Sequence, residues 1–162
     1  MENKHQKLPY RYGVGLMILN DENKIFIGKR ICSHHSYKYS WQMPQGGINL
    51  GETPSSAALR EMEEEIGCRN GDIIAESESW YRYDIPKHLI KKLWSGMYKG
   101  QQQKWFLIKF RGTDENINLK KTKHPEFYRW RWVEKYKLSD IVVPFKKNLY
   151  KKVIIEFKNW IK

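Results

Sequence analysis

The chain has 162 residues, of which 40% are hydrophobic and 14% aromatic, and this is ample for one domain with a buried core. Two cysteines are too few for a disulfide-rich secreted scaffold, so we expect a single domain over residues 1–162 with reduced Cys32 and Cys68 thiols. The 30 Lys and Arg against 18 Asp and Glu give a net charge of +12, which favours polyanionic partners, although a biased lysine content would give the same count.

The chain begins with polar residues and shows no apolar signal-peptide core there. The apolar stretch at residues 14–19 is far too short to cross a bilayer. We therefore expect a cytoplasmic protein without membrane association. We also expect a monomer, although the residues by themselves leave the oligomeric state open.

An alternation of extended segments and helices predicts an α/β fold. Residues 12–19 read as a buried strand and residues 24–29 as its hairpin partner. Residues 86–100 are rich in lysine and are expected to form a mobile loop. Four further extended segments are expected at residues 41–43, 73–83, 105–111 and 128–133. Apolar residues at intervals of four predict a final amphipathic helix after Pro144: Phe145, Leu149, Val153, Phe157 and Ile161.

A helix that carries several carboxylates is predicted between Thr53 and Gly67. Thr53 is a good N-cap, Pro54 suits the first helical position, and Gly67 suits the C′ position that ends a helix. Ala58, Met62 and Ile66 recur at intervals of four, and this stripe is expected to pack on the core.

Glu61, Glu64 and Glu65 fall within roughly one 100° sector of this helix, whereas Glu63 points away from them. Like charges on one face repel each other, and a bound divalent cation would reverse the sign of that interaction. Arg60 lies four residues before Glu64 and is expected to pair with it. A solvated acidic face is the simpler interpretation of these glutamates, but it leaves the surrounding glycines and Arg60 unexplained.

The full spacing of Gly46, Glu52, Arg60-Glu61, Glu64-Glu65 and Gly67 resembles the Nudix box, G-x5-E-x7-R-E-U-x-E-E-x-G-U, over residues 46–68. Met62 and Cys68 occupy U positions, where Leu, Ile or Val is usual, and only packing is expected to change. The resemblance implies a Nudix α/β/α sandwich with a mixed central sheet and hydrolysis of a nucleoside diphosphate linked to another group.

Longer runs resemble one branch of that family, the bacterial RNA pyrophosphohydrolase group, also called the (di)nucleoside polyphosphate hydrolase or invasion-associated protein A group. These runs are residues 10–15, 41–48, 103–107 and 125–133, including Trp-Gln-Met-Pro-Gln-Gly-Gly and Phe-Tyr-Arg-Trp-Arg-Trp-Val. In that strand, Trp130 and Trp132 alternate and therefore share one face, which indicates a structural role.

The resemblance implies a divalent cation, Mg²⁺ or Mn²⁺, as cofactor. It implies that Glu61, Glu64, Glu65 and Glu126 bind the metal and perform catalysis, and that the Gly46 carbonyl adds a ligand. Glu61 is the candidate general base, and Glu126 is an alternative base from outside the box. Glu52 is expected to support the loop.

Substrate contacts are expected from cations and from residues beside the box. Arg11, Arg82, Lys87 and Lys104 are candidates for holding phosphates. Phe145 and Lys146 are candidates for bracketing a base near the 5′ end, and Gln45 for contacting phosphate or base.

Three functions remain open from the sequence. The first is an RNA 5′ pyrophosphohydrolase that converts a 5′-triphosphate end to a monophosphate and starts mRNA decay. The second is a dinucleoside polyphosphate hydrolase of the Ap4A or Ap5A type, using the same site. The third is a non-catalytic nucleotide- or RNA-binding module, against which the intact glutamates argue.

Overall fold

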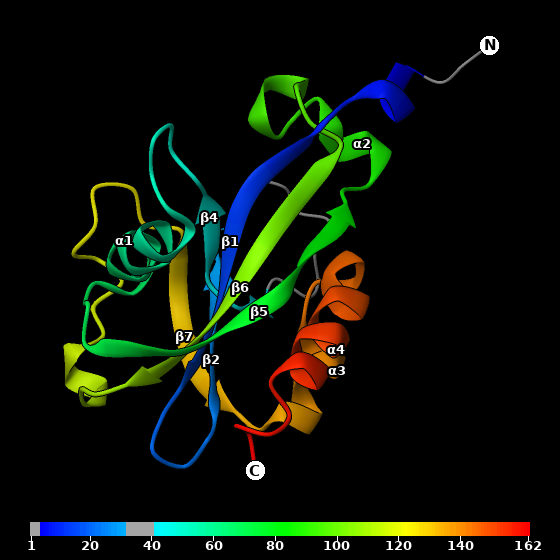
Figure 1. Cartoon of the computed structure of the whole chain (residues 1–162). Helices are drawn as coiled ribbons and strands as arrows, with labels where there is room; N and C mark the ends of the chain where they lie inside the picture. Colours follow the sequence, from blue (N-terminus) through cyan, green and yellow to red (C-terminus); the bar gives the residue numbers. More distant parts are fainter. Residues whose placement is uncertain (1–3, 32–40) are drawn as a thin grey trace.

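A computed structural model describes residues 4–31 and 41–162 of the chain. Within those residues the strands form one mixed sheet in the order β3-β2-β1-β6-β5, with β4 paired to β1 and β7 to β2 (Figure 1). The strands are β1 (Tyr10–Leu19), β2 (Ile25–Arg30), β3 (Trp41–Gln42), β4 (Gln45–Gly47), β5 (Gly71–Asp84), β6 (Gly100–Phe110) and β7 (Phe127–Val133). The helices are η1 (Lys4–Lys7), α1 (Pro54–Ile66), α2 (Lys87–Ile90), η2 (Trp94–Gly96), η3 (Asp114–Asn116), η4 (Lys135–Lys137), α3 (Leu138–Ile141), η5 (Pro144–Lys146) and α4 (Lys147–Glu156).

The centre of the sheet joins one parallel pair to antiparallel neighbours. β1 and β6 run parallel from the pair Tyr10 and Gly100 to the pair Leu19 and Lys109. β5 lies antiparallel to β6, and β4 lies antiparallel to β1. The prediction of an α/β fold with a mixed sheet is therefore confirmed.

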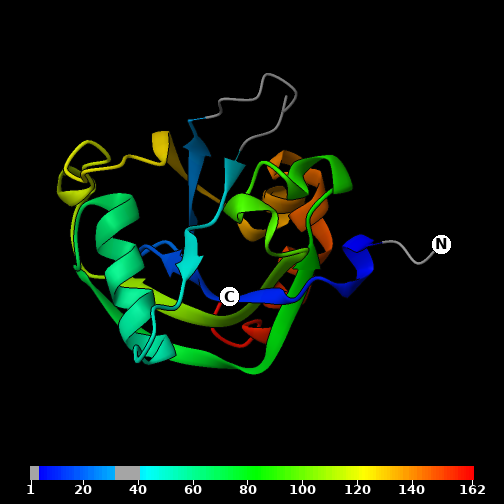
Figure 2. The same ribbon diagram turned by 90° about the horizontal axis from the view of Figure 1, so that it is seen from above.

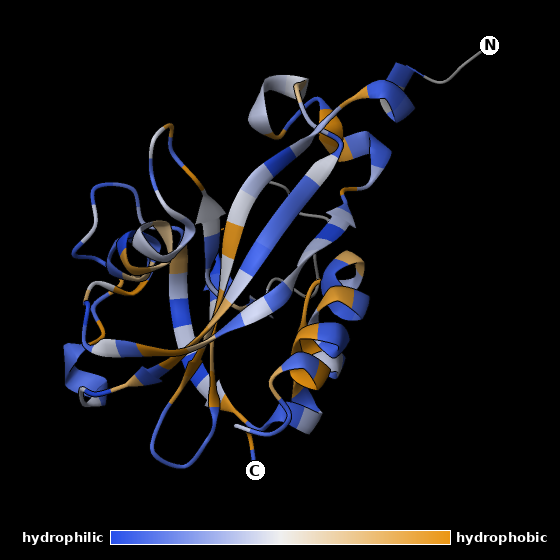
Figure 3. Ribbon diagram, in the orientation of Figure 1, coloured by the Kyte–Doolittle hydropathy of each residue, from blue (hydrophilic) through white to orange (hydrophobic). Residues whose placement is uncertain are grey.

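Alternation along β1 and β6 divides the core between the two faces of the sheet. Val14, Leu16 and Phe106 belong to the cluster that packs against α1. Met17 and Leu107 belong to a second cluster, which includes residues of α4. Figure 2 shows α1 and the C-terminal helices on opposite sides of the curved sheet, and Figure 3 shows the hydrophobic residues concentrated where the central strands cross.

Several expected elements differ from those observed. β2 pairs with β1 only between Leu19 and Ile25, and makes its longer pairing with β7. β6 begins at Gly100, before the expected segment at residues 105–111. Its first part consists largely of glutamines, and their polarity does not fit the hydrophobic pattern that predicts a strand. The expected loop at residues 86–100 contains the short helices α2 and η2, and Leu89 and Ile90 anchor α2 in the interior.

The last helix ends before the apolar pattern that predicted it. α4 ends at Glu156, yet Phe157 and Ile161 beyond it are still buried, together with Leu149 and Val153. Trp130 and Trp132 pack on Phe26, as the structural interpretation of these residues predicts. Cys68 is a free buried thiol, whereas Cys32 lies outside the described residues.

Candidate active site

The helix that carries the glutamates begins and ends where the sequence predicts. The Thr53 side chain accepts a hydrogen bond from the Ser56 amide at 3.2 Å, and Pro54 occupies the first turn. Gly67 ends the helix with φ of 83°, and its amide donates to the Glu63 carbonyl at 3.0 Å. A side chain at Gly67 would also meet the Asn118 carbonyl, so this glycine is required by both conformation and packing.

Arg60 connects the helix to the loop that precedes it. Its guanidinium donates to both carboxylate oxygens of Glu52, at 2.7 and 2.8 Å, and to the Gly47 carbonyl at 2.8 Å. It also pairs with Glu61 at 2.9 Å and with Glu64 at 3.1 Å. The expected Arg60–Glu64 pair is therefore present as one of several contacts. Glu52 supports the loop as expected, and its hydrogen bonds to Arg60 lower its pKa to about 2.

The clustered carboxylates occupy different environments. Glu61 and Glu65 are buried, whereas Glu64 and Glu126 are exposed. Burial is the main cause that raises the pKa of Glu61 to about 7; the contact with Arg60 opposes this shift, and the negative charges of Glu64 and Glu126 add to it. Burial also raises the pKa of Glu65 well above its ordinary value, with contributions from Glu126 and Glu61. Of the three glutamates in the sector expected from helix geometry, two are therefore buried and one is exposed.

β4 brings backbone groups to the same point. Gly46 pairs with Val14 across β1 and β4, and any side chain at this position would collide with the Glu61 carboxylate. The backbone amide of Gln45 donates to Oε2 of Glu65 at 3.2 Å. This close approach of strand and helix explains the glycine and places the backbone of β4 beside both buried carboxylates.

The chemistry of this donor set suits a hard divalent cation. All of its ligands would be oxygens, and Oε1 of Glu65 is buried without a hydrogen-bond partner among the described residues. Across the residues that the structure describes, no three His, Cys, Asp or Glu side chains already converge as metal ligands would. Arg60 holds Glu61 and Glu64, so a cation would compete with its guanidinium for these two carboxylates.

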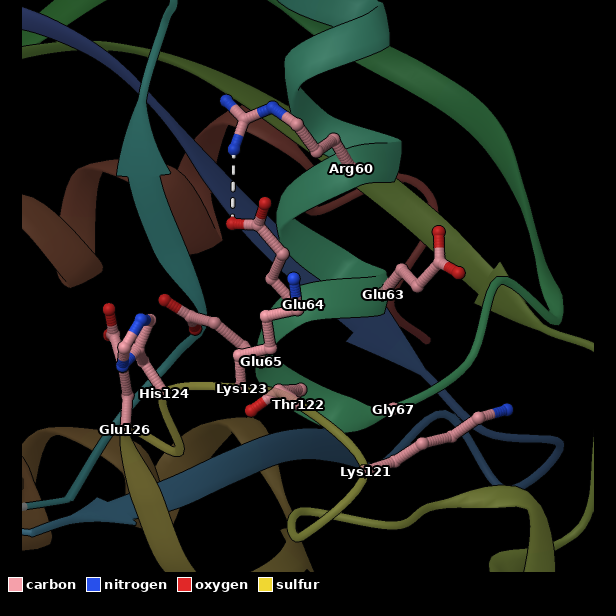
Figure 4. A pocket seen from close by; sticks show the side chains of 10 residues that line it. All are labelled: Arg60, Glu63, Glu64, Glu65, Gly67, Lys121, Thr122, Lys123, His124 and Glu126. Atoms are coloured by element: carbon pink, nitrogen blue, oxygen red, sulfur yellow. Dashed lines mark hydrogen bonds and ion pairs between the residues drawn. The ribbon is translucent and has the colours of Figure 1, made fainter.

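A cavity of about 620 Å³ lies between α1 and the loop before β7. Figure 4 shows Glu64 and Glu65 projecting from α1 toward this space, with His124 and Glu126 on the opposite wall; Glu63 also borders the cavity, but its side chain turns to the other side of α1 from Glu64. Glu63 pairs with Arg69 instead. The sequence pattern therefore separates Glu63 correctly from the other glutamates.

A smaller cleft of about 100 Å³ lies on the other side of Glu126. Besides Glu126, it brings together five of the predicted positions: Arg11, Gln45, Gly46, Phe145 and Lys146. It also contains residues that the sequence interpretation missed, among them Arg30, Tyr83 and Trp94. Arg30 ends β2 directly opposite Phe127, the residue after Glu126, and only this strand pairing reveals its place.

Lys146 is buried at the base of this cleft. Its ammonium donates to Oε1 of Gln42 at 2.8 Å and lies 5.3 Å from the centre of the Tyr83 ring. Burial, followed by the charge of Arg30, lowers its pKa well below the ordinary value for lysine. Because burial disfavours the charged form of this amine, a negatively charged or electron-rich ligand in the cleft would favour its protonation.

Arg11 and Gln45 are fixed by neighbours in the cleft. The Arg11 guanidinium lies 5.5 Å from the centre of the Trp94 ring. The side-chain amide of Gln45 donates to the Tyr83 hydroxyl at 3.1 Å and accepts from the Gln103 side chain at 3.2 Å. Contact of Gln45 with a ligand stays a prediction, and it would require exchange of one of these hydrogen bonds.

Three predicted cations do not line either cavity. Arg82 of β5 is the register partner of Gln102 on β6, and Lys104 of β6 is the register partner of Trp80 on β5. Arg82 and Lys104 both project from the face of the sheet opposite the small cleft. Lys87 is exposed at the start of α2. Their roles in substrate binding stay predictions.

Comparison with known proteins identifies the family. The NUDIX domain model matches residues 9–153. The chain belongs to the Nudix family. It is 58% identical over 158 residues to a protein named RNA pyrophosphohydrolase from Rickettsia bellii, covering 98% of this chain and 96% of that protein. It is 57% identical to the protein of the same name from Rickettsia prowazekii, over 98% and 96% of the two chains.

Solved structures show the same Nudix fold at low sequence identity. The Escherichia coli dihydroneopterin triphosphate pyrophosphohydrolase superposes with a TM-score of 0.66 at 16% identity, over 91% of this chain and 98% of that chain. The Caenorhabditis elegans Ap4A hydrolase superposes with a TM-score of 0.61 at 18% identity and the same coverage. Nudix hydrolases generally use divalent cations, in agreement with the donor set described above. Among the described residues, no helix is both long and apolar enough to span a membrane.

Proposed function

We propose that this Nudix hydrolase removes pyrophosphate or successive phosphates from the 5′-triphosphate end of RNA and leaves a 5′-monophosphate, which initiates mRNA decay. The proposal is supported by relatives named RNA pyrophosphohydrolase that are similar over 98% of this chain. The observation that carries it in the structure is the contact between β4 and α1, where Gly46 lies against the Glu61 carboxylate and the Gln45 backbone amide donates to Glu65. We further propose a monomeric, cytoplasmic protein that acts with Mg²⁺.

The residues proposed to hold the cation are Glu61, Glu64, Glu65 and Glu126, with the Gly46 carbonyl. A bound divalent cation neutralises phosphate charge and makes a water molecule more acidic. Glu61 is the proposed general base, a role that it would share with metal binding, and its position against β4 supports this assignment. Arg60 orients Glu61 and Glu64, and its two bonds to Glu52 fix its own position.

The small cleft is the proposed position of the nucleoside at the 5′ end. Arg11 and Arg30 line it beside Glu126 and supply charges for the phosphates that lead to the carboxylate cluster. Phe145 and Lys146 offer an aromatic ring and a cation to a base. The larger cavity next to Glu64 and Glu65 would then receive the phosphates that are removed.

A competition assay tests the proposed substrate. A 5′-triphosphorylated RNA and diadenosine pentaphosphate would be presented to one sample with Mg²⁺, and kcat/KM compared for the two. The proposal expects faster turnover of the RNA, with release of pyrophosphate or phosphate, and turnover by Glu65→Gln that is lower by orders of magnitude. Faster turnover of the dinucleotide would replace the RNA proposal with a dinucleoside polyphosphate hydrolase. Absence of metal-dependent turnover on both would favour a binding module.

A further inference from the structure

Aromatic and cationic side chains gather on one face of the sheet outside both cavities. Tyr12 of β1 and Arg82 of β5 are both register partners of Gln102 on β6, and Trp80 is the partner of Lys104. Because paired residues project from the same side of a sheet, these five side chains share one surface. We call it the outer sheet face, and define it by Tyr12, Trp80, Arg82, Gln102 and Lys104.

Three of its side chains, those of Tyr12, Trp80 and Arg82, are exposed, whereas Gln102 and Lys104 are partly buried. Tyr12 is 58% exposed and Trp80 37% exposed, although both are large aromatic residues. The residues of β1 that follow on the same side, Val14 and Leu16, pack in the cluster with α1. In Figure 1 no helix is drawn across the N-terminal parts of β1 and β6, and Figure 3 colours these parts as largely hydrophilic.

The side chains of the outer sheet face hold one another in place. The rings of Tyr12 and Trp80 meet edge to face at 5.5 Å, and the Lys104 ammonium lies 6.0 Å from the centre of the Trp80 ring. Arg82 donates to the Gln102 side chain at 2.9 Å, and its guanidinium lies 5.0 Å from the Tyr10 ring. A ligand would therefore meet ordered rings and cations, which lowers the entropy cost of binding.

The local charge is positive but moderate. Arg82 and Lys104 are joined by Lys99, whose ammonium lies 4.8 Å from the Tyr10 ring. Against these cations stand Glu76, 3.6 Å from Lys104, and Asp84, which accepts a hydrogen bond from Tyr10 at 2.6 Å. This moderate positive charge, together with the exposed rings, suits a ligand that has spaced negative charges with flat apolar groups between them.

The outer sheet face is also continuous with the catalytic loop. The Tyr12 carbonyl accepts a hydrogen bond from the Ile48 amide at 3.2 Å, and the next residue, Gly13, pairs with Gly47. Gly46 beside them touches the carboxylate cluster. A strand of nucleic acid whose 5′ nucleoside lies in the small cleft would turn around the edge of the sheet beside β4 to reach this surface, which is on the opposite face.

We propose that the outer sheet face binds single-stranded RNA downstream of the 5′ end, with bases stacked on Trp80 and Tyr12 and backbone phosphates near Arg82 and Lys104. Stacking on sheet aromatics beside cations is a mode that suits single strands of any sequence. The inference rests on the proposed function for its direction along the RNA, and it gives a role to two cations that line neither cavity.

The first experiment compares substrate lengths. Wild type, Trp80→Ala and Tyr12→Ala would hydrolyse a 5′-triphosphorylated trinucleotide and a single strand of about 15 nucleotides. Each variant is expected to lose about tenfold in kcat/KM on the longer RNA, through KM, because the stacking of one base is lost. The trinucleotide should be cleaved at the wild-type rate. Tyr136→Ala, which removes another exposed aromatic ring from η4, is the matched control and should alter neither substrate.

The second experiment separates this inference from the proposed function. Binding of a 5′-hydroxyl RNA of about 15 nucleotides would be measured by fluorescence anisotropy without metal, so that no hydrolysis is required. Trp80→Ala should weaken binding about tenfold, and Trp80→Phe should restore most of it, since a stacking ring is retained. Equal affinities for wild type and Trp80→Ala, with equal rates on both substrate lengths, would overturn the inference and favour a protein partner for this face. Failure of wild type to hydrolyse either RNA would refute the proposed function alone.

Discussion

Arg60 binds Glu52 through two parallel hydrogen bonds, from Nε to Oε2 at 2.7 Å and from Nη2 to Oε1 at 2.8 Å. This fork-to-fork geometry fixes the plane of the guanidinium as well as its position. The remaining nitrogen, Nη1, is thereby directed at Glu61 and Glu64. One ion pair thus connects the loop, the helix and two of the proposed metal ligands.

Replacement of Arg60 by lysine should separate the geometry of this contact from its charge. A lysine keeps the positive charge but cannot form the fork, so we expect Arg60→Lys to lower kcat by about 10- to 100-fold. Steady-state hydrolysis of triphosphorylated RNA at saturating Mg²⁺ measures this loss. Arg69→Lys, at an exposed arginine paired with Glu63, serves as control. Equal activity of Arg60→Lys and wild type would show that charge alone is required.

Glu65→Gln should separate catalysis from stability. The glutamine side chain retains an oxygen that can accept from the Gln45 backbone amide. The change also removes a carboxylate whose pKa is raised by burial. We expect a folded protein whose metal-free melting temperature is no lower than that of wild type, with turnover reduced by orders of magnitude. Calorimetry and the RNA assay measure the two properties. A near-normal rate in the folded variant would contradict the proposed role of Glu65 as a metal ligand.

Gly46→Ala should damage activity through crowding. The added methyl group would meet the Glu61 carboxylate, which would have to turn away. Because a displacement of about 1 Å in a catalytic group costs about 100-fold in rate, we expect a loss of that order. Gly51→Ala is the matched control, since a side chain there meets open space, although φ of 77° makes it strained. It should reduce stability by about 1 kcal/mol and leave kcat intact.

The metal-free protein should lose stability as the pH rises toward neutrality. Burial raises the pKa of Glu61 from 4.5 to about 7, so the folded protein keeps a proton that the unfolded chain releases in this window. The stability from this group is therefore fully present below pH 4.5, and about 3 kcal/mol of it is lost by about pH 7. The raised pKa of Glu65 acts in the same direction.

Urea unfolding with a chelator, measured from pH 4.5 to pH 8, checks this sign. Glu61→Gln cannot titrate and should flatten part of the slope. Glu52 has the opposite sign, because its lowered pKa stabilises the protein above pH 4.5, and its contribution is lost only as the pH falls toward 2. Wild-type stability that rises between pH 4.5 and 7 would contradict the burial of Glu61 as described.

Lys146→Met should weaken substrate binding more than it weakens the fold. The change removes the cost of a buried ammonium but deprives Gln42 of its donor, and these effects oppose each other. We expect a melting temperature within about 5 °C of wild type and a KM for RNA about tenfold higher. Lys147→Met, at the exposed neighbouring position, is the control. An unchanged KM for Lys146→Met would remove this residue from the substrate site.

Local patterns in the sequence predicted the elements that depend on nearby residues. Thr53, Pro54 and Gly67 fixed the ends of α1, because capping and left-handed conformation are properties of single residues and their immediate neighbours. The apolar stripe of Ala58, Met62 and Ile66 fixed its buried side in the same way. The start of β6 escaped prediction, since Gln101 and Gln103 are buried polar residues that also bond to Tyr83 and Gln45, which are distant in the chain.

The sequence by itself determined the family, the helix with its glutamates and the α/β class, because a fixed spacing on one helix is set by local geometry. Only the tertiary structure separated buried Glu61 and Glu65 from exposed Glu64, since burial depends on what β4 places against the helix. It alone brought Arg30 and Tyr83 to the cleft with Lys146, and it set Arg82 and Lys104 on the opposite face. Strand register decides which side chains share a face or a cleft. Register depends on how two segments pair, and the spacing of residues along one segment does not give it.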